Sequence, residues 1–171
     1  MQDLKKIIRE VPDFPRKGIL FYDVTTLLRL PAALKEVIDS FVDQYSGKHV
    51  DIVIGMESRG FIFAPPVACR LGAGFVPVRK PGKLPWKTKT VTYDLEYGKD
   101  ALEIHEDAVQ PGQRVLIVDD VIATGGTAAA TVRMAREMGA EVIGAAFLIE
   151  LTFLKGKEKL NGTPFFSILQ Y

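Results

Sequence analysis

The residues that build disulfide frameworks and metal cages are scarce in this sequence. One cysteine and two histidines occur among 171 residues, so an internal disulfide is excluded and the chain suits a reducing compartment. Cys69 lies in an apolar helical pattern, which predicts a small core residue. His49 and His105 are predicted to lie at the surface or in packing contacts. No cluster of histidine, aspartate and glutamate has the spacing of a metal cage, so we expect no metal site made by the protein alone.

Long apolar runs and an excess of one charge are missing as well. No apolar run approaches the about 18 residues that span a bilayer, and no apolar signal segment follows the charged N-terminus. The 22 basic and 21 acidic side chains nearly balance, which argues against general binding to nucleic acids or membrane surfaces. We therefore expect a single cytoplasmic domain, residues 1–171, that has neither a nucleic acid nor a membrane as its partner.

One stretch of the sequence has a strand, two acids, a loop of small residues and a helix in succession, which is typical of a ligand site. Residues 115–118 are apolar and mostly β-branched, as in a buried parallel strand. Asp119 and Asp120 follow where that strand should end, and a loop of small residues then leads into a helical run at 128–138. In open α/β sheets, ligands bind outside the carboxyl ends of the strands, beside helix N-termini.

The loop in this stretch suits a phosphate. Gly125 and Gly126 permit positive φ angles and a close backbone approach, so consecutive N–H groups can surround an anion. Thr124 and Thr127 add hydroxyl donors. Carboxylates beside a phosphate repel it, so the two acids make sense if they accept hydrogen bonds from sugar hydroxyls or meet a cation. The stretch therefore predicts a sugar phosphate as ligand; the alternative is a solvated strand end followed by an ordinary glycine turn.

Two other segments suit a multiply charged anion. A strand at 50–56 runs into the polar turn 57–60 and then into an apolar helix at 61–71. With Arg59 in the turn, this order is again the geometry of an anion site. Residues 79–89 hold basic side chains and no acid, and their prolines exclude regular structure, which indicates a long binding loop. The alternatives are a helix cap with a surface arginine and a solvated basic turn.

The remaining pattern alternates strands with helices. A short N-terminal helix should end at Pro12, residues 14–24 read as a packed loop over the core, and a helix should start near Pro31. A hairpin is expected from residues 91–105, with its turn at 97–100. Further strands are expected at 74–78, 142–151 and 165–169. This alternation predicts an α/β fold with a central, mainly parallel twisted sheet flanked by helices.

Together these sites predict a reaction. The loop and the acid pair suit a ribose with its 5′-phosphate, whereas the 57–60 turn and the 79–89 loop suit a pyrophosphate. Displacement of pyrophosphate from an anomeric carbon needs electrostatic stabilisation, orientation and exclusion of water more than a strong nucleophile. Mg²⁺ would bridge oxygens of the substrate and keep several waters, so the substrate would supply most of the metal ligands.

The stretch at 115–127 resembles the 5-phosphoribosyl-1-pyrophosphate (PRPP) signature of the type I phosphoribosyltransferases. This resemblance implies that Asp119 and Asp120 bind the ribose hydroxyls. It also implies that the 5′-phosphate is bound by Ala123, Thr124, Gly125, Gly126 and Thr127. The whole chain is similar to the adenine branch of this family. The motifs that carry this likeness are Glu-Ser-Arg-Gly-Phe at 57–61, Arg-Lys-Pro-Gly-Lys-Leu-Pro at 79–85, Tyr-Asp-Leu-Glu-Tyr-Gly at 93–98 and Glu-Leu-Thr at 150–152.

The likeness implies the type I phosphoribosyltransferase fold, with a hood at about 1–30 and a flap at about 79–105. It implies purine salvage, in which PRPP donates its phosphoribosyl group to N9 of adenine to give AMP and pyrophosphate. Mg²⁺ would assist, and the enzyme would be a cytoplasmic homodimer. These implications change the interpretation of residues 14–24 from a covering loop to a hood that recognises the base.

The likeness also implies roles for single residues. Adenine would lie among Leu20, Phe21, Tyr22 and Leu151, with Phe21 stacked on the base; the family commonly has arginine at the position of Tyr22. Pyrophosphate would contact Glu57, Ser58, Arg59, Arg79, Lys80 and Lys83. The Glu57–Ser58 peptide would be cis. Glu96 would exchange a proton near N7 and N9 of the purine, and Tyr97 would belong to the mobile flap.

Two alternatives are open at this point. One is a phosphoribosyltransferase for xanthine, hypoxanthine or guanine, although a backbone carbonyl that accepts from the adenine amino group would be left unpaired by an oxopurine. The other is a PRPP-sensing regulator without catalysis, since a fold does not fix a function. Such a regulator should carry an added DNA-binding segment, and 171 residues leave no room for one.

Overall fold

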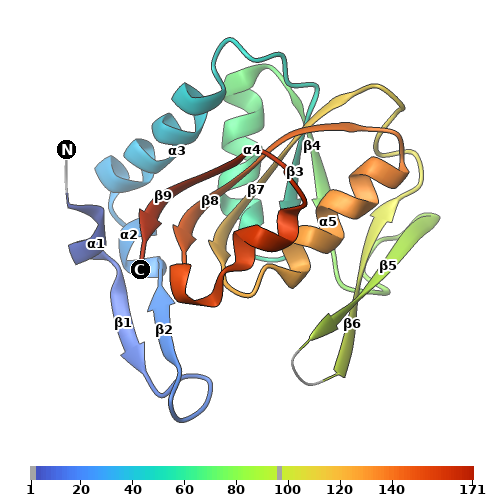
Figure 1. Cartoon of the computed structure of the whole chain (residues 1–171). Coiled ribbons are helices and arrows are strands. Elements are labelled where there is room, and N and C mark those ends of the chain that lie inside the picture. Colours follow the sequence, from blue (N-terminus) through green and yellow to red (C-terminus); the bar gives the residue numbers. More distant parts are fainter. Residues whose placement is uncertain (1–2, 96–97) are drawn as a thin grey trace.

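The protein is built on a five-stranded parallel sheet, seen in a computed structural model that describes residues 3–95 and 98–171. The strand order is β4-β3-β7-β8-β9. Figure 1 shows the sheet running through the middle of the molecule. Its strands are β3 (Ile52–Met56), β4 (Gly74–Val78), β7 (Arg114–Ile122), β8 (Glu141–Glu150) and β9 (Phe165–Gln170). The predicted α/β class with a central parallel sheet is therefore confirmed.

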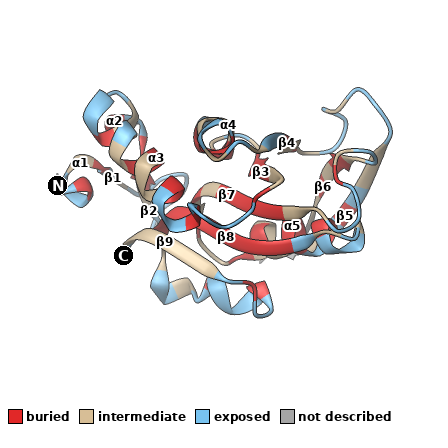
Figure 2. Cartoon of the chain, turned by 90° about the horizontal axis from the view of Figure 1, so that it is seen from above, coloured by how far each residue is buried: buried red, intermediate tan, exposed pale blue. Residues whose placement is uncertain are grey.

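Helices cover both faces of the sheet, because its central strands are apolar on both sides. Val53, Leu116 and Leu148 belong to one buried cluster, which also contains the inner faces of α3 (Pro31–Tyr45) and α4 (Gly60–Leu71). The residues that alternate with them along these strands belong to a second cluster, under α5 (Gly126–Glu137). In Figure 2, β7 and β8 are buried along most of their length. This two-sided burial explains why the strands read as continuous apolar runs.

Two antiparallel hairpins flank the carboxyl ends of the central strands. One consists of β1 (Arg9–Pro12) and β2 (Leu20–Asp23), and the other of β5 (Thr88–Leu95) and β6 (Gly98–His105). Figure 1 shows them extending from opposite sides of the molecule. A bridge from Arg79 to Glu103 joins the second hairpin to the chain just after β4. The short helices are α1 (Leu4–Ile7), α2 (Thr25–Leu28), η1 (Thr152–Leu154) and η2 (Gly156–Leu160).

The hairpin elements differ from the sequence prediction. Residues 14–24 were expected to form a packed loop, but Leu20–Asp23 is a strand because it pairs with Arg9–Pro12. That pairing also ends the N-terminal helix early, at Ile7. Thr88 and Lys89, expected in the basic loop, begin β5 opposite His105 and Ile104.

The strand predicted at residues 115–118 is longer than expected. Asp119 and Asp120 were expected just beyond its end, yet β7 continues through both residues to Ile122. The reason is its neighbour β8, which stays in register with β7 as far as the pair formed by Ile122 and Glu150. The acid pair therefore lies within β7 and not in the loop. This strand pairs with β3 over Val115–Val118 and with β8 as far as Ile122.

Cys69 is exposed, so the prediction of a core cysteine is wrong. The buried face of α4 consists of Gly60, Phe63, Ala64, Val67 and Ala68. Position 69 falls outside that face because each residue turns the helix by about 100°. The apolar composition of the segment hid this, since apolar residues occur on both faces of α4.

Candidate active site

The acid pair on β7 meets the turn that opens α4. Nε of Arg59 lies 2.6 Å from Oδ2 of Asp120, and the Asp120 side chain is only 5% exposed. This contact is an ion pair without hydrogen-bond geometry, since Oδ2 has no hydrogen-bond partner among the described residues. Oδ1 of Asp119 accepts the N–H of Asp120 at 2.9 Å. Arg59 and the two predicted ribose-binding acids are thus brought together.

Asp119 sits in a crowded and poorly hydrated place. Burial raises the pKa of its carboxyl group well above the usual range, and the neighbouring charge of Asp120 adds to this rise. Gly60, at the start of α4, allows the close approach. A Cβ there would lie 2.8 Å from Oδ1 of Asp119 and 3.1 Å from the carbonyl oxygen of Val118. The glycine of the 57–60 turn is therefore a packing requirement of the acid pair.

The predicted phosphate loop joins β7 to α5. Gly125 has φ +77°, and a Cβ there would lie 2.2 Å from the carbonyl oxygen of Gly156. Helix α5 has 12 residues and begins at Gly126, so its free N–H groups and positive dipole end face the loop. A cavity of about 110 Å³ lies at this point. Its lining includes Asp119, Ala123, Thr124, Gly125, Gly126 and Thr127.

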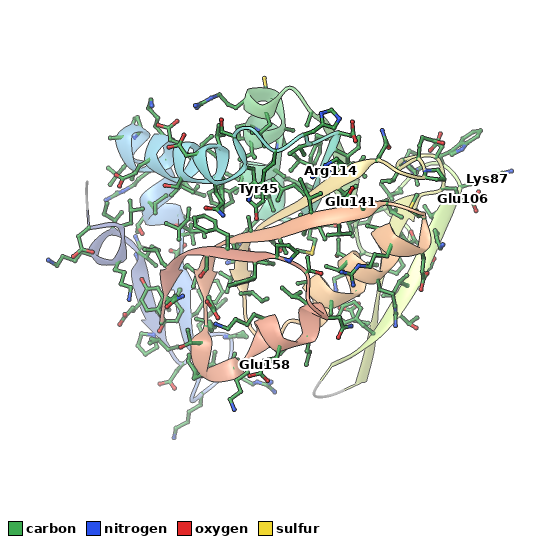
Figure 3. The ribbon with its side chains drawn as sticks, turned by 45° about the horizontal axis from the view of Figure 1, so that its top comes forward. Tyr45, Lys87, Glu106, Arg114, Glu141 and Glu158 are labelled. Atoms are coloured by element: carbon green, nitrogen blue, oxygen red, sulfur yellow. The ribbon has the colours of Figure 1, made fainter. Side chains whose placement is uncertain are left out.

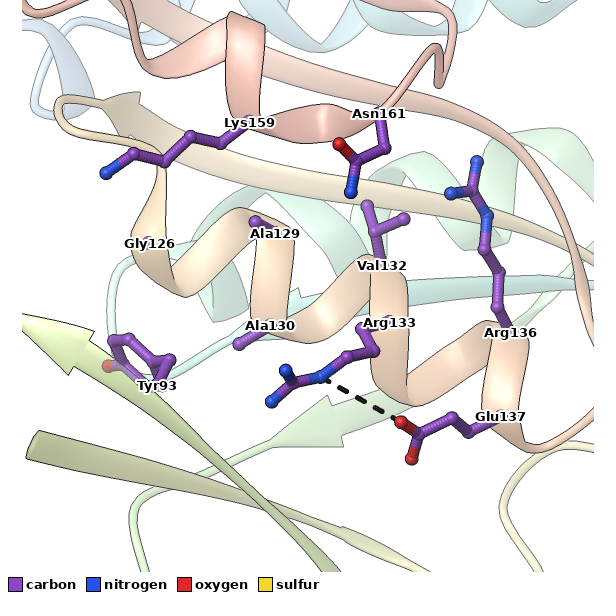
Figure 4. A pocket seen from close by; sticks show the side chains of 10 residues that line it. All are labelled: Tyr93, Gly126, Ala129, Ala130, Val132, Arg133, Arg136, Glu137, Lys159 and Asn161. Carbon is purple, nitrogen blue, oxygen red and sulfur yellow. Dashed lines mark ion pairs between the residues drawn. The ribbon is translucent and has the colours of Figure 1, made fainter.

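A larger cavity of about 560 Å³ lies along the outer side of α5, as Figure 4 shows. It shares Gly126 and Ala129 with the region of the first helical turn, but its polar groups are mainly Arg133, Arg136 and Glu137. It contains neither acid of the pair. The smaller cavity is the better candidate for the sugar phosphate, because loop N–H groups and a carboxylate line it together.

Glu57 gathers the basic residues that were predicted to bind pyrophosphate. Its carboxylate accepts hydrogen bonds from Nζ of Lys83 at 2.5 Å and from Nε and Nη2 of Arg79 at 3.3 Å each. The backbone N–H of Lys80 donates to the same group at 3.1 Å. The bond from Lys83 and those from Arg79 and Lys80 lower the pKa of Glu57 to about 2 against the opposing effect of burial. The Glu57–Ser58 peptide is cis, as predicted.

The hood approaches Arg59 through Phe21. The guanidinium carbon of Arg59 lies 5.2 Å from the centre of the Phe21 ring. Phe14 packs edge-on against the same ring at 5.1 Å. At this distance a cation interacts favourably with the negative face of an aromatic ring. Arg59 therefore lies between the acid pair and the hood.

The side chain of Tyr22 packs inside the protein. Its side chain is 9% exposed and lies against Tyr171, with ring centroids 4.1 Å apart. Burial, with a smaller contribution from the charge of Glu10, raises the pKa of its hydroxyl. The ring thus packs in the core beside the C-terminal residue. Leu151, the other residue predicted at the base, lies just after the end of β8. Its N–H donates to the carbonyl oxygen of Ile122 at 3.0 Å.

Three residues near the site were given no role of their own in the sequence analysis, although Tyr93 opens the motif at 93–98. Gly156 lies against the phosphate loop, since a Cβ there would be 2.2 Å from the carbonyl oxygen of Ala123. Tyr171 packs on Tyr22, and Tyr93 hydrogen-bonds to Thr127. A glycine next to Lys155 and two tyrosines in strand contexts give no local sign of such contacts. Glu96 and Tyr97 lie outside the described residues.

Over residues 3–95 and 98–171, no group of three or more His, Cys, Asp or Glu side chains could hold a metal ion. In the same residues no helix combines the length and the apolar character needed to cross a membrane.

The chain is similar to known proteins along almost its whole length. The family model described as phosphoribosyl transferase domain matches residues 23–163. An adenine phosphoribosyltransferase from Solibacter usitatus is 61% identical over 171 residues, which cover 100% of this chain and 99% of that protein. The crystal structure of adenine phosphoribosyltransferase from Thermoanaerobacter pseudethanolicus has a TM-score of 0.96 and 49% identity, and covers 99% of this chain and 98% of its own.

A second similar structure carries ligands. The Saccharomyces cerevisiae adenine phosphoribosyltransferase, complexed with an imino-altritol bisphosphate and adenine, has a TM-score of 0.92 and 44% identity. The match covers 98% of this chain and 97% of that one. The chain therefore belongs to the phosphoribosyl transferase family and, within it, to the adenine phosphoribosyltransferases, the purine salvage enzymes that convert adenine and PRPP into AMP and pyrophosphate.

Proposed function

We propose that the phosphoribosyl transfer of this chain takes place where the phosphate loop, the acid pair and the hood meet. Arg59 carries this assignment, because one guanidinium lies 2.6 Å from Asp120 and 5.2 Å from the ring of Phe21. Residues expected to bind ribose, pyrophosphate and base thus share one place. In the reaction N9 of adenine forms a bond to C1 of the ribose, the bond from C1 to the pyrophosphate oxygen breaks, and the proton of adenine N9 is lost.

The positions of the groups support the proposed PRPP contacts. The 5′-phosphate binds to N–H and hydroxyl groups of Ala123, Thr124, Gly125, Gly126 and Thr127. Asp119 and Asp120 accept hydrogen bonds from the 2′- and 3′-hydroxyls of the ribose. Both hydroxyls are donors, so they can satisfy the buried oxygen of Asp120 that has no hydrogen-bond partner among the described residues. Negative charge also accumulates close to C1, where positive charge develops as pyrophosphate leaves.

Pyrophosphate binds between the 57–59 turn and the basic loop, to Ser58, Arg59, Arg79, Lys80 and Lys83. The Glu57 carboxylate already orders Arg79 and Lys83 on one side. A lysine ammonium has three donor hydrogens and a guanidinium has five. Their remaining donors are therefore free to turn toward the leaving group. Glu57 contributes by holding these cations, since a carboxylate and a pyrophosphate repel each other.

Mg²⁺ fits this site as a metal held mainly by PRPP and water. The acid pair supplies hard oxygen donors of the kind that Mg²⁺ prefers, and an oxygen of Asp120 lacks a hydrogen-bond partner in the described part of the chain. When bound, the ion neutralises charge on the pyrophosphate. Asp119 and Asp120 would hold it through the ribose hydroxyls or water rather than in a cage of side chains.

Adenine binds in the hood beside Leu20, Phe21, Tyr22 and Leu151. Leu20 is exposed and Phe21 half-buried on β2 of the hood hairpin, so a ligand can reach both residues. Phe21 stacks on the base, while backbone groups of Leu20 and Tyr22 recognise its N6 and N1 edge. Glu96 takes up the proton lost from the imidazole, and Tyr97 belongs to the flap that closes over the ligands. We expect Glu96→Gln to lower turnover more than adenine affinity.

The enzyme acts as a cytoplasmic homodimer in this proposal. Ile62 on α4 and Phe75 on β4 are large apolar side chains that remain exposed in the single chain. Apolar surface of this kind is what subunit interfaces bury. Light scattering coupled to gel filtration will give a mass of twice 18.9 kDa if the proposal is correct, and a mass of 18.9 kDa will contradict the dimer.

One assay tests the whole assignment. The enzyme is incubated with PRPP and either adenine or hypoxanthine, with and without Mg²⁺, and nucleotide formation is measured. We expect AMP from adenine only with Mg²⁺ present, slow or no turnover of hypoxanthine, and a raised KM for PRPP in Asp120→Asn. Faster turnover of hypoxanthine would contradict the base assignment, and PRPP binding without AMP formation would indicate a regulator.

A further inference from the structure

We propose that Tyr93 is a positioning residue that fixes the pyrophosphate side and the 5′-phosphate side of the PRPP site relative to each other. This inference rests on the proposed function of the site, because it concerns residues to which that proposal gives phosphate contacts. Tyr93 lies on β5, outside the loop and the turn that sequence reasoning singled out. Figure 4 shows its side chain beside Gly126, where α5 begins.

The Tyr93 hydroxyl is shared by three groups from separate parts of the chain. It accepts from Nζ of Lys80 at 3.1 Å and from Oγ1 of Thr127 at 3.3 Å. It donates to Oδ2 of Asp100 at 3.0 Å. A tyrosine hydroxyl has one donor hydrogen and can accept up to two hydrogen bonds. Its capacity is therefore used completely, which is the behaviour of a structural junction rather than of a free surface hydroxyl.

On the pyrophosphate side, the junction orients Lys80. The Lys80 ammonium also forms an ion pair with Asp100. Two of its three hydrogens are thus engaged, one by a neutral hydroxyl and one by a carboxylate. The third hydrogen remains for an anion, and the two fixed contacts determine the direction in which it points. The side chain of Asp100 is 27% exposed and that of Lys80 is 39% exposed, so a ligand can reach this pair.

On the 5′-phosphate side, the junction reaches the first turn of α5. Thr127 belongs to the predicted phosphate loop, and its backbone oxygen accepts from Oγ1 of Thr131 at 2.9 Å. Oγ1 of Thr131 also contacts Sδ of Met56 at the end of β3, at 3.0 Å. Thr127 is thereby held to β3 through Thr131 and to β5 through Tyr93. Helix α5 and β5 are further joined by Nη2 of Arg133, which donates to the carbonyl oxygen of Thr92 at 2.6 Å.

The consequence is a coupling between the two ends of one substrate. PRPP carries a phosphate at C5 and a pyrophosphate at C1, and it gains affinity from both only if the two sites have the right separation. Tyr93 sets that separation through one oxygen atom. Removing this oxygen takes one contact from Lys80 and one from Thr127, so both phosphate contacts weaken together. Removing the charge of Asp100 disturbs only the Lys80 side.

The test uses Tyr93→Phe, with Tyr45→Phe as the matched control. The hydroxyl of Tyr45 lies against Gly144 in the core, away from the site, and Tyr45 can be found in Figure 3. Calorimetry measures the affinity of each protein for pyrophosphate with Mg²⁺ and, separately, for ribose 5-phosphate. Steady-state kinetics then give KM for PRPP, KM for adenine and kcat.

We expect Tyr93→Phe to weaken binding of both ligands and to raise KM for PRPP by about tenfold, the equivalent of one or two lost hydrogen bonds. KM for adenine should stay close to that of the control. Asp100→Asn keeps a partner for the hydroxyl but loses the charge, so it should weaken pyrophosphate binding alone. This asymmetry is a readout that a general loss of stability would not produce.

The inference is overturned if Tyr93→Phe binds both ligands as tightly as Tyr45→Phe does, or if its effect is confined to one ligand. It is also overturned if Asp100→Asn weakens both ligands equally. The wild-type enzyme separates this outcome from a failure of the proposed function. If the wild type forms AMP from adenine and PRPP while the variants match the control, only the role of Tyr93 is wrong.

Discussion

Two carboxyl groups of the same site have opposite pKa shifts, and the cause lies in their immediate neighbours. Glu57 is surrounded by Lys83, Arg79 and the N–H of Lys80, which favour its charged form and lower its pKa to about 2. Asp119 is partly buried beside Asp120, and both desolvation and the charge of Asp120 raise its pKa. A carboxyl group therefore serves as a fixed anion in one place and, in the other, as a group that gains from added hydrogen-bond donors.

Glu57→Gln should reveal the stability that this fixed anion contributes. Its pKa is lowered in the folded state, so its contribution is present above the ordinary pKa of about 4.5 and is lost as pH falls toward 2. A shift of this size corresponds to at most about 3 kcal/mol, and solvent screening reduces it. Urea unfolding of both proteins between pH 7 and pH 3 measures the difference in the free energy of unfolding.

The difference between wild type and Glu57→Gln should be largest at neutral pH and shrink on acidification. Glu158→Gln, at an exposed position on η2, is the control and should differ little from wild type over the same range. A pH-independent difference for Glu57→Gln would mean that its charge is not what stabilises the basic loop.

Gly60→Ala tests whether α4 must approach the acid pair closely. The added Cβ would lie 2.8 Å from Oδ1 of Asp119 and 3.1 Å from a backbone oxygen, so either the helix or the carboxylate must move. We expect a loss of about 1–3 kcal/mol in the free energy of unfolding, with a raised KM for PRPP. In the control Gly74→Ala, the nearest atom is Cδ1 of Ile52, at the end of a side chain. Equal PRPP kinetics in both variants would refute this packing constraint.

At the scale of elements, the site is made by loops and turns that follow the carboxyl ends of parallel strands. The turn after β3 holds Glu57 and Arg59, the loop after β7 holds the proposed phosphate contacts, and Leu151 of the proposed base site follows β8. Figure 3 shows Arg114 and Glu141 as close neighbours on β7 and β8. Their ion pair, at 3.3 Å, lies near the amino ends of these strands. The two ends of the sheet thus have separate tasks, one structural and one chemical.

These elements could be predicted where the information is local. The apolar run at 115–118, the small residues of 123–127 and the following helical period are consecutive in the chain, so sequence reasoning found the strand, the loop and the helix in order. The length of β7 and the strand at Leu20–Asp23 depend on partners elsewhere in the chain. The hydroxyl of Tyr93 contacts three side chains distant in the sequence, so the motif at 93–98 could not reveal those contacts.

Phe21→Ala tests the hood as an element that recognises the base. Aromatic stacking is worth about 0.5–1.5 kcal/mol beyond area burial, so we expect KM for adenine to rise by roughly threefold to tenfold. KM for PRPP should change less, because the phosphate loop and the basic loop are untouched. Phe153→Ala is the control, since that side chain is 67% exposed on η1. Steady-state kinetics with each substrate varied in turn provide the measurement, and an unchanged KM for adenine would remove Phe21 from the base site.

At the scale of the whole molecule, the site lies where the two apolar clusters on opposite faces of the sheet meet the two hairpins. The cluster under α3 and α4 contains Tyr22 of the hood, and the cluster under α5 contains Val91 and Leu102 of the other hairpin. Each hairpin is thus anchored to the sheet domain by apolar packing. The near balance of charge over the chain agrees with this arrangement, because the positive charge needed for PRPP is concentrated locally.

Ligand binding at such a junction should stabilise the entire fold. PRPP with Mg²⁺ contacts groups from β7, α5, the 57–59 turn and the basic loop in the proposed complex, and a ligand that binds only the folded state stabilises it by mass action. At a hundredfold excess over Kd the gain is about 2.7 kcal/mol, which for a chain of this size raises Tm by about 5–10 °C.

Differential scanning calorimetry of the wild type should therefore show a rise in Tm with PRPP and Mg²⁺ that grows with ligand concentration. The rise should be much smaller without Mg²⁺, because the pyrophosphate then keeps its full charge beside the buried acids. Asp120→Asn should lose most of the ligand-dependent rise at equal PRPP concentration, since the ribose contact weakens while the phosphate loop stays in place. Equal rises in wild type and Asp120→Asn would separate ribose binding from the acid pair and place the sugar elsewhere on the edge of the sheet.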